Sequence, residues 1–152
     1  MDLIIKNGKI VSPVEVYEAD IAVKDGIIAA IGKGFDETGA QVVDASGKYV
    51  LPGAIDVHTH LAMPFGGTVS ADGYFSGTRA AACGGVTTVF DYAIQRKGKG
   101  IVQTVEERNK MAENEACVDY AFHCAITDLN GGALLDEFSA AAEYGVPSFK
   151  CF

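Results

Sequence analysis

The first fifty residues alternate between apolar and polar side chains with a period of two, which predicts β-strands. Asn7-Gly8 and Asp25-Gly26 each separate two such strands, and both dipeptides favour a type I′ hairpin turn. Ala45-Ser46-Gly47 marks a third turn. We expect a small antiparallel sheet that forms the N-terminal part of a β-sandwich domain over residues 1–52. Its predicted strands cover residues 3–6, 9–11, 21–24, 27–31, 41–44 and 48–51.

After Pro52-Gly53 the pattern changes to strands separated by helical stretches, which is typical of βα units around a parallel sheet. Gly145 is placed to end one helix. Thr104 and Glu107 have the spacing of a capping box, although the first turn of that helix could begin earlier, around Gly100. We predict strands at residues 54–60, 86–91, 119–126 and 148–152, and helices at about 72–83, 104–115 and 134–144.

The segment Asp56-Val57-His58-Thr59-His60 places two imidazoles on one face of the first of these strands, since side chains in a strand alternate between faces. The Cα atoms of His58 and His60 should lie roughly 6–7 Å apart. With zinc–nitrogen bonds of about 2.0–2.1 Å, both rings could bind a single ion. Asp56, on the same face, could orient one of these ligands.

Four strands alternating with three helices fit either half of an eight-stranded barrel or the start of an open doubly wound sheet. The histidines lie at the C-terminal end of their strand, where barrel enzymes build their sites. No glycine-rich phosphate loop follows that strand, which disfavours a nucleotide-binding fold. We therefore predict an α/β fold in which residues 53–152 form the first half of a TIM barrel. Because a closed barrel usually needs at least roughly 200 residues, we expect the chain to be a fragment.

Composition excludes several classes of protein. The formal net charge is −8, and Arg96-Lys97-Gly98-Lys99, the one short basic cluster, is interpreted as a solvated loop, so nucleic acid is not expected as a partner. No stretch reaches the roughly 20 apolar residues of a membrane span, and the N-terminus leads directly into a strand, so we expect a cytoplasmic protein without a membrane partner. The cysteines lack CxxC spacing and are expected to be free, buried thiols. They are Cys83, Cys117, Cys124 and Cys151.

Four segments together resemble one enzyme family over the whole chain. They are Pro52-Gly53-Ala54-Ile55-Asp56-Val57-His58-Thr59-His60-Leu61, Met63-Pro64-Phe65-Gly66-Gly67-Thr68, Gly85-Val86-Thr87-Thr88-Val89-Phe90-Asp91-Tyr92 and Ser148-Phe149-Lys150. The chain resembles the N-terminal third of the dihydropyrimidinases and hydantoinases, which are cyclic amidohydrolases of the amidohydrolase superfamily. This resemblance implies a TIM barrel beside a β-sandwich built from both chain termini, and a homotetramer in the full-length protein.

The resemblance also implies hydrolysis of the cyclic amide of dihydropyrimidines or hydantoins by two zinc ions, bridged by a hydroxide and by a carboxylated lysine. It implies that His58 and His60 bind the more buried zinc and that Lys150 is the bridging lysine. An apolar site beside two cations favours the neutral amine that takes up carbon dioxide. The remaining ligands lie on later strands of the family's barrel, so we expect no turnover by this chain alone; detectable hydrolysis of dihydrouracil would contradict this.

For the substrate, the apolar loop that contains Met63 and Phe65 follows the histidines directly and could form a wall against a ring substituent. The family places such residues in its substrate-gating loops. Phe152 could join this wall, or it could be an ordinary core aromatic. Ala62 occupies the position where a dihydroorotase would have an arginine, which argues for a neutral ring as the substrate.

Several alternatives stay open. The chain could belong to a non-catalytic scaffold protein of the same fold, to another cyclic amidohydrolase such as an allantoinase, or to a stable half-barrel with a binding role. The open edge after the fourth strand argues against the last. His123 is interpreted as a core residue or as support for a ligand, and Asp91, at the end of the second strand, as a turn cap or a site residue.

Overall fold

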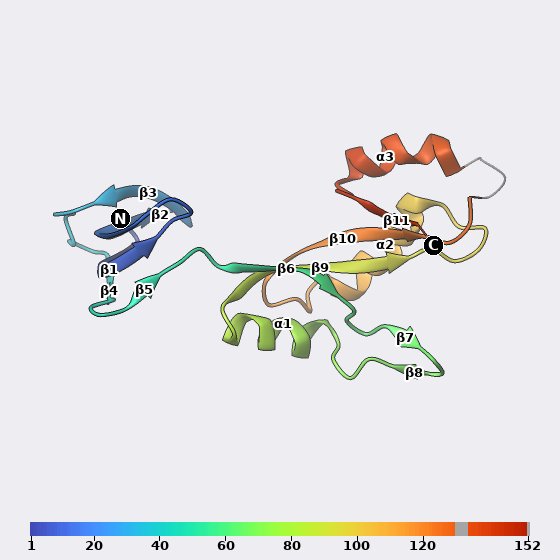
Figure 1. Cartoon of the computed structure of the whole chain (residues 1–152), viewed down its shortest axis with the longest axis horizontal. Coiled ribbons are helices and arrows are strands. Elements are labelled where there is room, and N and C mark those ends of the chain that lie inside the picture. Colours follow the sequence, from blue (N-terminus) through green and yellow to red (C-terminus); the bar gives the residue numbers. More distant parts are fainter. Residues whose placement is uncertain (130–133, 152) are drawn as a thin grey trace. The chain divides into compact units, whose positions relative to one another are not determined.

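A computed structural model describes residues 1–129 and 134–151, which form two compact units, Met1–Pro52 and Gly53–Phe152 (Figure 1). The first unit is a five-stranded sheet with the order β3-β2-β1-β4, in which β5 also pairs with β1. Its strands are β1 (Leu3–Val11), β2 (Val16–Lys24), β3 (Ile27–Gly32), β4 (Gln41–Asp44) and β5 (Tyr49–Val50).

The hairpin expected at Asp25-Gly26 is confirmed. Strands β2 and β3 pair antiparallel, and both turn residues have positive φ angles, 52° for Asp25 and 75° for Gly26, as a type I′ turn requires. Ile10, Ala19 and Ile21 form the small core of this sheet.

The prediction of a hairpin at Asn7-Gly8 is wrong. β1 runs continuously through this dipeptide, and its pairing with β2 shifts between Ile5 and Gly8, so the two residues form a bulge. Asn7 takes a φ of 60°, and a Cβ on Gly8 would lie 2.5 Å from Cγ2 of Val50. A purely antiparallel sheet is also wrong, because β4 and β5 both pair with β1 in parallel.

The second unit has the α/β architecture that the sequence predicts. A parallel four-stranded sheet has the order β11-β10-β9-β6, and β7 and β8 form a separate hairpin that the sequence analysis did not anticipate (Figure 1). The strands are β6 (Ala54–Thr59), β7 (Pro64–Phe65), β8 (Thr68–Val69), β9 (Val86–Ile94), β10 (Asp119–Ile126) and β11 (Phe149–Cys151). The helices are α1 (Tyr74–Cys83), α2 (Ile101–Ala112) and α3 (Glu137–Tyr144).

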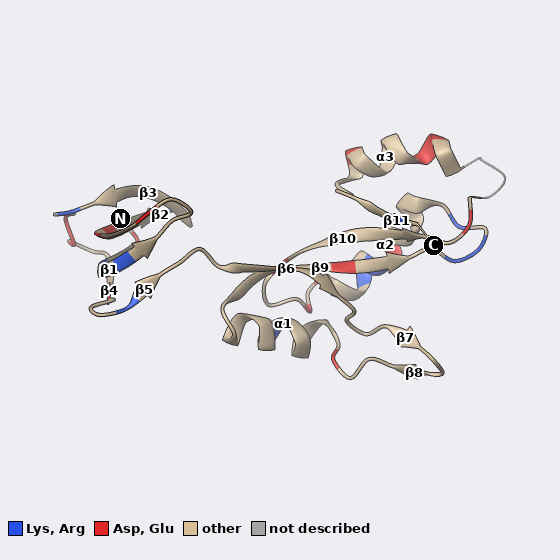
Figure 2. Cartoon of the chain, in the orientation of Figure 1, with Lys and Arg blue, Asp and Glu red and all other residues tan. Residues whose placement is uncertain are grey.

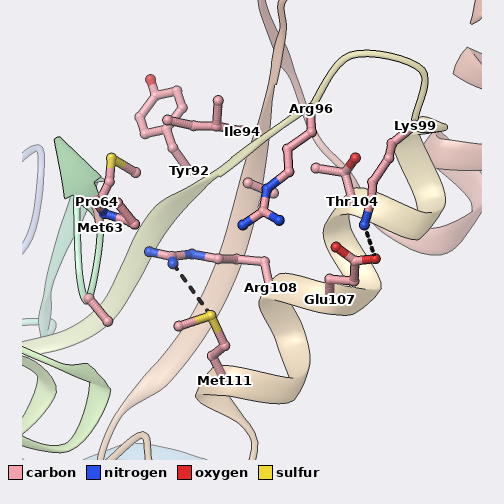
Figure 3. A pocket seen from close by; sticks show the side chains of 12 residues that line it. Met63, Pro64, Tyr92, Ile94, Arg96, Lys99, Thr104, Glu107, Arg108 and Met111 are labelled. Carbon is pink, nitrogen blue, oxygen red and sulfur yellow. Dashed lines mark hydrogen bonds and ion pairs between the residues drawn. The ribbon is translucent and has the colours of Figure 1, made fainter. Parts of the chain in front are cut away.

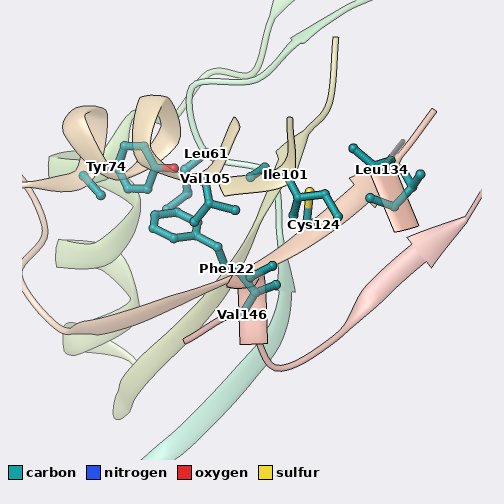
Figure 4. Packing of buried hydrophobic residues seen from close by; sticks show 12 residues of the cluster. Leu61, Tyr74, Ile101, Val105, Phe122, Cys124, Leu134 and Val146 are labelled. Atoms are coloured by element: carbon teal, nitrogen blue, oxygen red, sulfur yellow. The ribbon is translucent and has the colours of Figure 1, made fainter. Parts of the chain in front are cut away.

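Helix α2 begins near Gly100, the earlier of the two starts considered, and Gly100 is its N-cap. Thr104 Oγ1 donates to the Gly100 carbonyl at 2.7 Å and Glu107 pairs with Lys99, so neither residue forms the expected capping box. Helix α3 begins at Glu137 and ends at Gly145, whose φ of 103° closes it as expected. The core of this unit is shown in Figure 4, where Ile101 and Val105 of α2 pack with Phe122 and Cys124 of β10.

The described helices are all too short and too polar to cross a membrane. The four cysteines are free, but the expectation of burial is wrong for three of them: Cys83, Cys117 and Cys151 are exposed, because they lie at a helix end, in a loop and on a short outer strand. Burial raises the pKa of the Cys124 thiol to about 11. Lys and Arg are spread over both units, with basic positions in the loop between β9 and α2 (Figure 2).

Candidate metal centre

His58 and His60 lie at the C-terminal end of β6 with their Nε2 atoms turned toward each other and their ring planes nearly perpendicular. Their Nε2 atoms are 3.2 Å apart, and the ring centroids are 5.0 Å apart. Two nitrogen ligands bound tetrahedrally at about 2.0 Å from one ion lie about 3.3 Å apart. The pair therefore fits a zinc-sized ion between the two Nε2 atoms.

Two hydrogen bonds hold the backbone around His58. Asp56 accepts a hydrogen bond from the His58 backbone N–H at 3.1 Å, so it orients the main chain of this residue and not its imidazole. Thr59 Oγ1 donates to the Phe90 carbonyl at 3.1 Å. The register between β6 and β9 shifts between Asp56 and Thr59, so His58 lies in an irregular stretch of the strand.

Tyr92 of β9 is the common neighbour of the candidate ligands, and the sequence analysis did not select it. Its ring centroid lies 4.7 Å from that of His58 and 5.2 Å from that of His60. On the same ring, the Lys150 Nζ lies 5.2 Å from the centroid. β6 and β11 are the two outer strands of the described sheet, yet their candidate ligands meet at one aromatic side chain. The period-two alternation of β9, which places Phe90 and Tyr92 on the face of the histidines, was the signal for this residue.

His123 of β10 lies on the same face, half-buried, with its ring stacked on Phe90 at 5.0 Å. Its Nε2 lies 3.1 Å from the Val57 carbonyl, which can only accept, so this nitrogen carries the proton. Its Nδ1 then accepts from the Ser148 hydroxyl when the ring is neutral. These contacts join Val57, the residue before His58, to the segment that leads to Lys150. They therefore favour the interpretation of His123 as support for the metal ligands over its interpretation as a core residue.

A buried network holds the main chain directly after His60. Asp91 is fully buried, and it accepts hydrogen bonds from the Leu61 backbone N–H at 3.3 Å and from the Tyr74 hydroxyl at 2.5 Å. Arg108 of α2 donates to the same carboxylate from Nε at 3.0 Å and from Nη2 at 2.6 Å, and it also donates to the Leu61 carbonyl. Burial and the Asp91 contact raise the pKa of Tyr74, so it stays a neutral donor.

The sequence suggested that Asp91 ends its strand, and this is wrong because β9 continues to Ile94. Asp91 does not cap a turn either; it fixes the backbone that follows the second histidine. The sequence analysis missed Arg108. The available signal was its place in α2, three residues after Val105 and four before Ala112, which lie on the buried side of that helix.

The electrostatics favour the form of His60 that binds metals. Partial burial of its imidazole lowers its pKa, the positive charges of His58 and Lys150 act in the same direction, and Asp91 opposes them. A neutral imidazole has the lone pair that a metal needs. Within the described residues, no group of three or more His, Cys, Asp or Glu side chains is placed to hold a metal.

The residues expected to contact a substrate do not gather in the structure. Met63 is buried and lines a cavity of about 360 Å³ beside α2 (Figure 3), whereas Phe65 in β7 is 83% exposed. Phe152 lies outside the described residues, so its expected place in the same wall stays a prediction.

A parallel sheet with paired histidines at the C-terminal end of a strand is typical of α/β enzymes that build their active sites at that edge. Comparisons with known proteins agree with this class. The amidohydrolase family matches residues 49–130, and the N-terminal domain of the urease alpha subunit matches residues 1–50. The chain belongs to the amidohydrolase family.

Similar proteins within that family confirm the resemblance found in the motifs. The D-hydantoinase of Geobacillus stearothermophilus is 47% identical over 152 residues, which cover 100% of this chain and 32% of that protein. The dihydropyrimidinase of Rattus norvegicus is 37% identical and covers 99% of this chain and 30% of that protein. A crystal structure of a D-hydantoinase matches with a TM-score of 0.93 at 45% identity, over 98% of this chain and 32% of the other. The chain spans about a third of the length of the curated relatives that it matches.

Proposed function

We propose that this chain carries part of the metal centre of a cyclic amide hydrolase that opens hydantoin or dihydropyrimidine rings. The observation that carries the proposal is the 3.2 Å separation of the His58 and His60 Nε2 atoms beside a tyrosine ring that also faces Lys150. The names of the similar proteins, D-hydantoinase and dihydropyrimidinase, supply the reaction class.

In this proposal His58 and His60 hold one zinc ion, and Lys150 is carboxylated and bridges it to a second. Carboxylation joins the neutral lysine nitrogen to the carbon of carbon dioxide and releases one proton, which leaves a carbamate with two oxygen ligands. When bound, zinc would supply Lewis acidity toward the ring carbonyl and would favour the hydroxide form of water.

The remaining parts of the proposal concern the longer architecture. Residues 53–152 correspond to the first half of a TIM barrel, and residues 1–52 to the N-terminal part of a β-sandwich domain. The parallel order β11-β10-β9-β6 supports the first assignment, because a barrel pairs consecutive strands in this way. Met63, Phe65 and Phe152 remain candidates for substrate contact, and the homotetramer implied by the resemblance belongs to the same proposal.

Binding of Co²⁺ to the chain, followed by visible absorption, tests the metal site directly. We expect His58→Ala and His60→Ala each to weaken binding by more than about 100-fold, since loss of a mere supporting residue costs about 10–100-fold. Cys117→Ser is the matched control, because this exposed thiol could bind cobalt adventitiously. Equal affinity in the wild type and in both histidine variants would overturn the site.

The activity is tested in a polypeptide that continues this chain with the remaining segment of the D-hydantoinase from Geobacillus stearothermophilus. Hydrolysis of hydantoin and dihydrouracil is expected from this chimera, and Lys150→Ala should abolish it while Lys97→Ala, in an exposed loop, should not. A chimera that folds and binds two zinc ions but opens neither ring would leave the metal site standing and reject the proposed reaction.

A further inference from the structure

A cavity of about 360 Å³ lies beside the end of β9, between the segment Ala62–Pro64 and helix α2 (Figure 3). Its volume falls within the range of small-molecule sites, about 300–1,000 Å³. His58, His60 and Lys150 do not belong to its lining, although Tyr92, their common neighbour, does. Its residues are Ala62, Met63, Pro64, Tyr92, Ala93, Ile94, Arg96, Lys99, Thr104, Glu107, Arg108 and Met111.

Cationic side chains outnumber carboxylates in the lining of the cavity. Its lining holds three cationic side chains, Arg96, Lys99 and Arg108, and one carboxylate, Glu107, while the chain as a whole carries −8. Lys99 and Glu107 form an ion pair with each other. Figure 3 shows the Arg96 and Arg108 side chains in the lining of this cavity. Because Asp91 pairs with Arg108 and Glu107 pairs with Lys99, the positive charge that these ion pairs leave in the lining is that of Arg96, and it favours a bound anion.

The guanidinium of Arg108 is held in place before any ligand binds. Its Nε and Nη2 are held by Asp91, so its position is fixed by the buried network. Its Nη1 donates to the Met111 sulfur at 3.7 Å. A thioether is a weak acceptor, so a carboxylate oxygen would be a stronger partner for this N–H group.

The rest of the wall is apolar. Met63 is buried, and Met111 and Ile94 are about half exposed at 45% and 41%. Phosphate would leave these surfaces without a contact, whereas a short hydrocarbon chain would cover them. The cationic and the apolar residues of the lining together favour a ligand that has an anionic group and an apolar chain.

We propose that this cavity binds a small carboxylate with a short aliphatic chain. Arg96 and the Nη1 of Arg108 receive the carboxylate, and Met63, Ile94 and Met111 contact the chain. The inference uses none of the candidate metal ligands, and it shares one residue, Met63, with the candidates for substrate contact in the proposed hydrolase function.

Methionine methyl NMR gives a direct test, because two of the three methionines of the chain line the cavity and the third, Met1, lies in the other unit. Hexanoate added to the ¹³C-methyl-methionine chain should shift the Met63 and Met111 signals with one saturable isotherm and leave Met1 unchanged. Hexanamide, which lacks the charge, and acetate, which lacks the chain, should each bind at least tenfold more weakly.

Two substitutions in the loop after β9 test whether the positive charge of Arg96 binds the carboxylate. Arg96→Gln should weaken hexanoate binding at least fivefold, and Lys97→Gln, its exposed neighbour outside the lining, should leave the affinity unchanged. Three results would overturn the proposal: absence of saturable shifts with hexanoate, equal loss in both variants, or inorganic phosphate that binds as tightly as hexanoate.

Discussion

At the scale of single residues, the Asp91–Arg108 ion pair is the contact on which the candidate metal centre most depends. The side chains are 0% and 10% exposed, and both bind the backbone of Leu61, the residue after His60. A buried charge that loses its partner is costly, because the remaining charge cannot be solvated. The pair therefore fixes one end of the histidine segment through its charge as well as its hydrogen bonds.

Asp91→Asn is expected to lower the free energy of unfolding by about 3–5 kcal/mol, because it leaves the Arg108 guanidinium buried without a carboxylate. Urea denaturation of the chain measures this loss. Glu107→Gln removes the exposed ion pair with Lys99 and should change stability far less. Equal effects of the two substitutions would show that burial does not control the strength of the Asp91 contact.

His123 of β10 contacts β6 and the segment before β11 through its two ring nitrogens, and we expect it to position the metal ligands. His123→Leu removes the contacts with Val57 and Ser148 and should weaken Co²⁺ binding by about tenfold, as is typical for a supporting residue. Ser148→Ala should weaken binding in the same direction. Phe90→Leu removes only the stacking partner, so a loss of affinity as large as that of His123→Leu would mean that ring packing, and not hydrogen bonding, is responsible.

At the scale of secondary-structure elements, the βα units were predicted well because helix and strand periods differ clearly in that half of the chain. Strand β10 has the predicted bounds, Asp119–Ile126. Asn7-Gly8 was misread, since a positive φ at this dipeptide is common to a hairpin turn and to a bulge, and only the partner strand distinguishes them.

Within the candidate site, the spacing of His58 and His60 was sufficient to predict that their rings face each other. The tertiary contacts of Tyr92 and Arg108 could not be predicted in this way. They depend on which strand lies beside β6 and on how α2 is rotated against the sheet, and neither is encoded in a local pattern. Met63 and Phe65 were expected on one wall, but Met63 is buried and Phe65, in the unpredicted β7–β8 hairpin, is 83% exposed.

Gly53 allows β6 to begin close to β9. A Cβ at this position would lie 2.1 Å from Oγ1 and 2.2 Å from Cγ2 of Thr87. Gly53→Ala should therefore destabilise the second unit by about 1–3 kcal/mol, the usual cost of overpacking. Thermal unfolding of the single and double variants measures this, and the cost should shrink in a Thr87→Gly background. An unchanged cost in that background would place the strain elsewhere.

Asp20 makes the stability of the first sheet depend on pH. The Asn7 backbone N–H donates to it at 2.9 Å and Lys33 lies 3.4 Å away, and these contacts hold the pKa of Asp20 below its ordinary value. A depressed pKa contributes stability that is present above about pH 4 and is lost as pH falls through the folded-state pKa. Asp20→Asn should thus be less stable than the wild type at neutral pH, and the difference should vanish in strong acid. Amide exchange in β1 and β2 measures the stability of the wild type and of the variant at each pH. A stability difference that persists in strong acid would show that it does not come from the ionised Asp20 carboxylate.

At the scale of the whole chain, the edges of the parallel sheet are the surfaces most open to association. β6 is an outer strand of the described sheet, and Ile55 and Val57 on it are 59% and 60% exposed. An outer strand with apolar side chains can pair with another chain, because its outward N–H and C=O groups are available. The acidic net charge opposes such contacts but is not concentrated on this strand, whose single carboxylate is Asp56.

We therefore expect the 152-residue chain to self-associate as its concentration rises, with β6 as the contact. Sedimentation velocity should show a growing weight-average mass for the wild type, and Ile55→Lys should suppress that growth, since a lysine on an outer strand disfavours pairing. Val14→Lys is the matched control: Val14 is 88% exposed, but it lies in the turn between β1 and β2 and not on a strand. Suppression by both substitutions would indicate that added positive charge, and not the edge of β6, governs association, and a wild type that stays monomeric would show that this edge is protected in solution.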